Sequence, residues 1–100
     1  MYLFTWESPL LPNLQACHGM DGGFYFGNTE VLGMTKGNPD AQQLSAKGSA
    51  AWASFARSGD PGWPEYTMEK RATMVWASKS HVEDDPMAAD RLLWEKITAA

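Results

Sequence analysis

A continuous aromatic and aliphatic run from Tyr2 to Trp6 constrains the fold of this chain more than any other feature. Its residues do not alternate with polar ones, and Ser8-Pro9 and Pro12 end the run, as is typical of a strand buried on both faces in a parallel sheet. A strand of that type needs neighbours in the same sheet. The run therefore predicts a parallel sheet, and it predicts self-association through this strand if its edge stays uncovered.

A long helix is predicted from its end signals. Asn38 is a suitable N-cap, Pro39 suits the first helical position, and Gly59 supplies a left-handed cap after Arg57 or Ser58. Gly48 in mid-helix indicates close packing or a local weakness. The apolar face is expected to comprise Leu44, Ala51, Trp52, Phe55 and the stem of Lys47.

The last third of the chain predicts a strand, a pairing segment and a second helix. Residues 72–76 are rich in strand formers, and His81-Val82-Glu83 is expected to pair with them. Asp85 as N-cap and Pro86 at the first position predict a C-terminal helix. Its core-facing residues are expected to be Met87, Leu92 or Leu93, Trp94 and Ile97. The tryptophans are expected to lie in the core, with Trp63 partly exposed on a proline-fixed turn.

The charge balance excludes two classes of partner. The formal net charge is -4 and the isoelectric point is near 4.9, and the basic residues are scattered along the chain. This composition argues against binding to nucleic acid or to an anionic membrane surface. No apolar run reaches the roughly 18 residues that span a bilayer.

The segment from Glu7 to Gly37 shows no clear periodicity apart from a helical turn near Asp21–Phe26, and it carries His18 between Cys17 and Gly19. An imidazole can act as general base toward a serine hydroxyl and then as general acid toward a leaving alcohol. A histidine that only hydrogen-bonds within a loop is the alternative. The chain contains no Gly-x-Ser-x-Gly nucleophile motif, so it looks like part of an enzyme.

Ordered blocks along nearly the whole chain resemble the C-terminal segment of the type B carboxylesterases, the serine-hydrolase family that includes para-nitrobenzyl esterases and, more distantly, cholinesterases. The blocks are Tyr2-Leu3-Phe4, Ala16-Cys17-His18-Gly19 with Asp21, Phe24-Tyr25-Phe26-Gly27-Asn28, the stretch 52–61, Trp63-Pro64-Glu65-Tyr66, Arg71-Ala72-Thr73-Met74 and Asp84-Asp85-Pro86.

The resemblance implies that residues 1–100 form the C-terminal portion of one α/β-hydrolase domain: buried strand, catalytic-histidine loop, helix, short strand or hairpin, and C-terminal helix. It implies that His18 is the triad histidine of a carboxylic ester hydrolase that works through an acyl-enzyme. The nucleophilic serine, the triad acid and the oxyanion loop would lie upstream. We therefore expect a truncated product or excised segment that is inactive alone and meets ester substrate only in a complete enzyme.

The resemblance also implies that Asp21 hydrogen-bonds within the site and is not the triad acid. A local Asx cap for the following turn is the alternative for this residue. Where the family usually has a branched aliphatic residue and a proline or polar residue, this chain has Gly22-Gly23, which adds backbone freedom beside His18.

Other candidate chemistry is weaker. Cys17 adjoins His18, but neighbouring residues in an extended segment point to opposite sides, so a buried structural thiol is expected. No serine has the glycine frame of a nucleophile. His18, Asp21 and His81 lack compact ligand spacing, and helix capping accounts for Asp84-Asp85 without calcium, so we predict no metal and no cofactor. The rival to the esterase interpretation is a small non-catalytic interaction module derived from the esterase fold.

Overall fold

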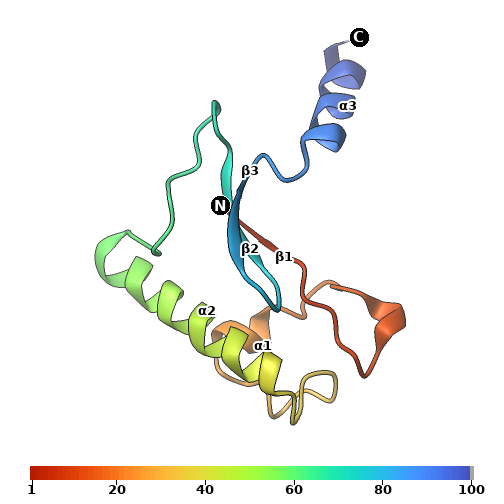
Figure 1. Ribbon diagram of the computed structural model, residues 1–100, viewed down its shortest axis with the longest axis vertical. Helices are drawn as coiled ribbons and strands as arrows, with labels where there is room; N and C mark the ends of the chain where they lie inside the picture. The colour runs from red at the N-terminus through yellow and green to blue at the C-terminus, as the bar shows by residue number, and fades with distance from the viewer. Residues whose placement is uncertain (100) are drawn as a thin grey trace.

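The computed structural model describes residues 1–99. Its elements follow one another in the order β1 (Tyr2–Phe4), the 3-10 helix η1 (Pro12–Leu14), α1 (Gly22–Tyr25), α2 (Pro39–Ser58), β2 (Ala72–Trp76), β3 (His81–Asp84) and α3 (Ala88–Ala99). A small sheet lies at the centre, α1 and α2 lie together on one side of it, and α3 extends away at the opposite end (Figure 1). Within residues 1–99, no helix has the length and apolar character that a bilayer crossing requires.

The sheet has three strands in the order β1-β2-β3. The strand β1 pairs with β2 in parallel, with Tyr2 opposite Met74 and Phe4 opposite Trp76, and β2 pairs with β3 in antiparallel fashion. The predicted parallel pairing of the N-terminal strand and the predicted strands after residue 71 are confirmed, but the residues of β1 are half-buried and the strand is not buried on both faces. The strand β1 ends at Phe4, two residues earlier than the apolar run, and it lies at an edge of the sheet.

The ends of α2 are those that the sequence predicts. Asn38 lies at the N-cap, and its Oδ1 accepts a hydrogen bond from the backbone N–H of Ala41 over 3.0 Å. Gly59 takes a left-handed φ of 77°, and its N–H donates to the Phe55 carbonyl over 2.7 Å. These two caps satisfy backbone groups that a helix end otherwise leaves open.

The buried face of α2 differs from the predicted one. The residues buried on it are Ala41, Leu44, Ser45 and Gly48. Trp52 and Phe55 are exposed instead, although the Trp52 ring still contacts Tyr2 and Tyr25 with one of its sides. Gly48 is a site of close packing: a Cβ at this position would lie 3.0 Å from Cδ1 of Tyr25. Trp63 is half-buried, as predicted, but Trp52 and Trp94, which were predicted to lie in the core, are exposed.

The core lies between the parallel strand pair and the α1–α2 layer. Phe24 of α1 is fully buried and meets Phe4 and Trp6 edge to face, each at a ring-centroid distance of 5.1 Å. The buried residues of this core are Trp6, Met20, Phe24, Ala41, Leu44 and Trp76. The segment that carries His18 therefore connects directly to the core through Met20 and Phe24.

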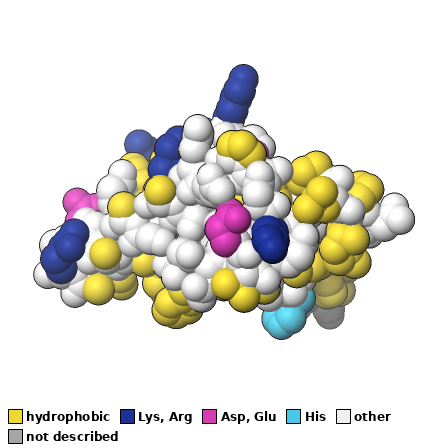
Figure 2. Space-filling model, turned by 90° about the horizontal axis from the view of Figure 1, so that it is seen from below, with side chains coloured by type: hydrophobic (Ala, Val, Ile, Leu, Met, Phe, Trp, Pro, Cys, Tyr) yellow, Lys and Arg dark blue, Asp and Glu magenta, His cyan; other side chains and the backbone are white. Residues whose placement is uncertain are grey.

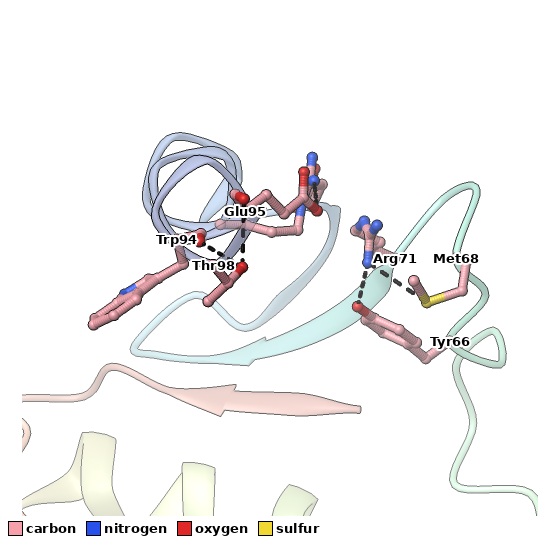
Figure 3. A network of polar contacts seen from close by, with 8 residues as sticks. Tyr66, Met68, Arg71, Trp94, Glu95 and Thr98 are labelled. Carbon is pink, nitrogen blue, oxygen red and sulfur yellow. Dashed lines mark hydrogen bonds and ion pairs between the residues drawn. The ribbon is translucent and has the colours of Figure 1, made fainter. Parts of the chain in front are cut away.

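The C-terminal helix begins later than predicted. Asp85 is not its N-cap: the residue takes a φ of +50°, and its carboxylate forms a two-pronged ion pair with Arg91. The side chains expected to face a core, Met87, Leu92, Leu93, Trp94 and Ile97, are all exposed. Figure 3 shows α3 with Trp94 directed away from the cluster that Arg71 forms with Tyr66 and Met68. No element within residues 1–99 covers the apolar face of α3.

Candidate functional site

His18 lies at the corner of a tight turn. The backbone N–H of Met20 donates to the Cys17 carbonyl over 3.3 Å, which closes a four-residue turn with His18 at its second position. Gly19 follows with a φ of +80°, the value that the third residue of a type II turn requires and that glycine adopts without strain. The His-Gly pair is therefore explained by the turn geometry, and it leaves the His18 side chain exposed.

The two ends of this turn are fixed to the core. Met20 has no exposed surface, and Cys17 is half-buried and packs against the core cluster. Because both flanking side chains point inward, His18 is directed outward on a supported backbone. Within residues 1–99 no hydrogen bond engages the His18 imidazole, so both ring nitrogens remain open to a partner.

Asp21 ends the turn segment and contacts the first strand. Its Oδ2 accepts a hydrogen bond from the Tyr2 hydroxyl at 3.4 Å, and its side chain does not cap α1. The Asx-cap alternative is therefore wrong, and α1 is closed by backbone bonds to the Asp21 carbonyl. Burial raises the pKa of the Tyr2 phenol above its ordinary 10.0, and the Asp21 carboxylate acts in the same direction.

Of the two glycines after Asp21, Gly23 is closely packed, whereas a Cβ on Gly22 would meet nothing within 4 Å. Gly22 and Gly23 form the first turn of α1, and a Cβ on Gly23 would lie 2.5 Å from Cδ1 of Leu32. The expected backbone freedom is therefore restricted, because the helix and the neighbouring Leu32 hold this segment. Two serines of α2 add to this support: Ser45 donates to the Phe24 carbonyl over 2.6 Å, and Ser49 to the Tyr25 carbonyl over 2.9 Å.

Asp40 joins three segments at the carboxyl ends of the parallel strands. Its Oδ2 accepts hydrogen bonds from Nε1 of Trp6, just after β1, and from the hydroxyl of Ser78, just after β2. Ligand sites of open α/β sheets lie at this edge, where loops leave the strands. The sequence indicates Asp40 only as an acid in the first turn of a helix, and no sequence signal reveals these two bonds.

Every serine hydroxyl of the chain donates within the chain, and none donates to a histidine. Six of them donate to backbone carbonyls and one to Asp40; the donors are Ser8, Ser45, Ser49, Ser54, Ser58, Ser78 and Ser80. A nucleophilic serine needs its proton directed to a base. The serines therefore act as structural residues.

His81 lies on β3 and has partners of its own. Its Nδ1 lies 3.0 Å from the Lys79 carbonyl and its Nε2 lies 3.3 Å from Glu83, and these contacts raise its pKa above the ordinary 6.5. In the part of the chain from residue 1 to 99, no three metal-ligating side chains come together. His18, Asp21 and His81 are thus not gathered into one site.

Figure 2 shows hydrophobic side chains gathered at the right of the view, the side on which the 5–21 loop and α3 lie in Figure 1. The exposed apolar residues of these two segments are Leu10, Leu11, Leu14, Met87, Leu92, Leu93, Trp94 and Ile97. The loop and α3 lie apart in Figure 1, and the apolar face of α3 by itself is the kind of surface that marks a contact site.

No protein-family model matches the chain. The chain is 34% identical over 99 residues to the para-nitrobenzyl esterase of Bacillus subtilis, an alignment that covers 91% of this chain and 20% of that enzyme. A solved carboxylesterase of Geobacillus stearothermophilus matches 94% of the chain at 36% identity with a TM-score of 0.78, and 21% of that structure is covered.

A solved para-nitrobenzyl esterase matches 92% of the chain at 32% identity with a TM-score of 0.81, and 21% of that structure is covered. The chain thus spans about a fifth of the length of the relatives it matches. These agreements in sequence and backbone show that the chain belongs to the type B carboxylesterase family and corresponds to the C-terminal segment of its members.

Proposed function

We propose that this chain contributes the triad histidine, His18, to a serine carboxylesterase of the α/β-hydrolase fold. The observation that carries the proposal is the exposed imidazole on a glycine-dependent turn whose two ends are packed into the core. A general base must reach the proton it abstracts within about 3 Å, so its backbone has to be held firmly. The family membership and the position of the turn after a parallel strand support the same role.

The reaction follows from the imidazole's two protonation states. One ring nitrogen of His18 accepts the proton of a serine hydroxyl while the serine oxygen attacks the ester carbonyl carbon. The protonated imidazole then gives that proton to the departing alcohol, which leaves an acyl-enzyme. Water hydrolyses the acyl group by the same route, with His18 again accepting and returning one proton. Asp21 hydrogen-bonds within the site, and the triad acid comes from elsewhere in the enzyme.

The nucleophile belongs to the part of the enzyme that these hundred residues do not span. Each serine of the chain is committed to a structural hydrogen bond, and the relatives are about five times longer than the matched segment. Without a nucleophile no acyl intermediate forms, and without oxyanion donors the transition state loses a stabilisation of about 3 kcal/mol per donor. We therefore propose that residues 1–100 alone do not hydrolyse esters.

A mixing experiment tests this function. The purified chain is combined with the Bacillus subtilis para-nitrobenzyl esterase from which the matching segment has been removed, and hydrolysis of a short-chain nitrophenyl ester is followed. Recovery of activity with the wild-type chain and with His81→Ala, but not with His18→Ala, supports the proposal. Hydrolysis by the purified chain alone that His18→Ala abolishes would overturn the proposed inactivity.

The second candidate is a non-catalytic interaction module that keeps the packing of an esterase end. It is favoured by the uncovered apolar face of α3 and by the free edge of β1, which both need a partner. The same mixture separates the two functions. Stable binding of the folded chain to the esterase body without any recovery of activity supports the module and contradicts a catalytic His18.

A further inference from the structure

We propose that Tyr2 is a positioning residue for His18 and acts through Asp21, a role that rests on the proposed function of His18. Tyr2 lies on β1, sixteen residues before the histidine, yet its hydroxyl donates to the Asp21 carboxylate at 3.4 Å. This bond connects the sheet to the segment that leaves the His18 turn.

The Tyr2 ring is held in place by two other aromatic rings. It meets Tyr25 of α1 edge to face at 5.6 Å between ring centroids, and it meets Trp52 of α2 in the same manner at 6.1 Å. Tyr25 and Trp52 contact each other at 4.9 Å. The position of the Tyr2 hydroxyl is therefore fixed by contacts with β1, α1 and α2. Asp21 binds this hydroxyl and is held in the same place.

The Tyr2–Asp21 bond is partly buried and lies beside the Tyr25 side chain. The Tyr25 hydroxyl beside it is buried and has no hydrogen-bond partner within residues 1–99. Burial, followed by the nearness of the Tyr2 phenol and the Asp21 carboxylate, raises the pKa of Tyr25 far above 10.0. Partial burial limits the access of solvent to the donor and the acceptor of the Tyr2–Asp21 bond.

Only Gly19 and Met20 separate Asp21 from His18. Met20 is fully buried and closes the turn through its N–H, while Gly19 is the flexible link. If Asp21 is held, the backbone from Met20 to Asp21 keeps its position. This restrains the backbone of His18 and thereby the direction of its side chain. A displacement of about 1 Å at a catalytic base costs roughly 100-fold in rate, so this restraint is large enough to matter.

The test uses the mixture of this chain with the esterase body. Tyr2→Phe keeps the aromatic packing and removes only the hydroxyl, whereas Tyr66→Phe is the matched control because its hydroxyl accepts from Arg71 away from this segment. We expect Tyr2→Phe to lower kcat about tenfold with KM changed less than about twofold, since positioning acts on the chemical step. Tyr66→Phe leaves both constants unchanged.

A double-mutant cycle shows whether Tyr2 acts through Asp21. In Asp21→Asn, adding Tyr2→Phe is expected to give no further loss of kcat, because the two residues share one interaction. Independent, additive losses would overturn the proposal, and so would a kcat of Tyr2→Phe equal to that of the wild type. A loss seen equally in Tyr66→Phe would also overturn it.

An exchange measurement on the chain alone separates this inference from the proposed function. The Met20 amide, which bonds to the Cys17 carbonyl, is expected to exchange about tenfold faster in Tyr2→Phe than in the wild type or in Tyr66→Phe. If the wild-type mixture shows no esterase activity, the proposed function fails. The exchange rate of the Met20 amide still tests whether Tyr2 restrains the His18 turn. An unchanged Met20 amide then contradicts the role of Tyr2.

Discussion

The indole Nε1 of Trp6 donates to Oδ2 of Asp40 over 2.9 Å, and this bond ties the end of β1 to the first turn of α2. Trp6 is 3% exposed, so water cannot replace Asp40 as the acceptor for its N–H. The loop that carries His18 begins immediately after this point. The placement of that loop therefore depends on a bond between two elements more than thirty positions apart in sequence.

Asp40→Ala is expected to lower the free energy of unfolding by about 1–3 kcal/mol, because it leaves the buried Trp6 N–H without an acceptor. Asp90→Ala is a matched control: Asp90 is also an acid in the first turn of a helix, but it is exposed on α3. Urea unfolding followed by tryptophan fluorescence measures both. Equal effects of the two substitutions would mean that only the helix dipole is involved.

Gly19→Ala is expected to destabilise the chain by about 1–2 kcal/mol, because an alanine at a φ of +80° meets its own carbonyl oxygen. Gly22→Ala makes the same substitution at the first residue of α1, where φ is not positive and a Cβ meets nothing within 4 Å. It is expected to be neutral or slightly stabilising. The pair is compared by urea unfolding, and a neutral Gly19→Ala would contradict the turn geometry.

Gly48→Leu is expected to cost about 1–3 kcal/mol, since the added side chain collides with the Tyr25 ring that already lies 3.0 Å from a Cβ position. The control is Ala46→Leu, which places the same side chain on the exposed face of α2. Thermal unfolding by circular dichroism compares the two. If both variants unfold at the same temperature, α1 does not pack against Gly48 in solution.

The ion pair between Asp85 and Arg91 holds the start of α3, and we expect acid to weaken it. The hydrogen bonds from Arg91 lower the pKa of Asp85 below its ordinary 3.8. A depressed pKa means that the stabilisation is complete above pH 3.8 and is lost as the pH falls through the lower folded value.

A carboxyl titration by NMR tests this anchorage. Arg91→Gln is expected to raise the titration midpoint of Asp85 toward 3.8, whereas Lys96→Gln removes the same charge from α3 without a bond to Asp85 and leaves the midpoint unchanged. A midpoint that does not respond to Arg91→Gln would show that the pair does not form in solution.

Self-association through β1 is expected to leave a pattern in amide exchange. The bonds from Met74 N–H to the Met1 carbonyl and from Thr5 N–H to the Trp76 carbonyl show that odd-numbered residues of β1 face β2. The N–H groups of Tyr2 and Phe4 then point to the free edge. They should become protected as the chain concentration rises, while Leu3 and Thr5 are protected throughout.

Sedimentation velocity at the same concentrations measures the mass of the chain in solution and shows whether it associates. Protection of Tyr2 and Phe4 without an increase in mass would exclude pairing between copies. An increase in mass with these two amides still unprotected would place the contact elsewhere, for which the exposed apolar side chains of α3 are one candidate surface.

Local signals were sufficient to predict several elements. The cap residues Asn38 and Gly59 predict both ends of α2, and the apolar run at Tyr2 predicts a strand with a parallel neighbour. These features depend on short-range chemistry, such as a side-chain oxygen that accepts a helix N–H, and they are visible in a single sequence.

Features that depend on distant contacts were not predictable in this way. The sequence at Asp85 resembles an N-cap, but Arg91 captures its carboxylate and shifts the start of α3 to Ala88. The apolar side chains of α3 have helical spacing, yet spacing cannot tell whether the surface they meet lies in the same hundred residues. The Tyr2–Asp21 bond likewise has no sequence signature, since it depends on how β1 approaches α1.

The pairing of residues 2–4 with residues 74–76 also imposes an order of events during synthesis. When β1 emerges from a ribosome, its hydrogen-bonding partner has not yet been translated, so the strand must wait for most of the chain before it is ordered. The helix α2, which is capped by its own neighbours, can form in the meantime. The loop with His18 is therefore translated before the strand that pairs with β1 at its leading end.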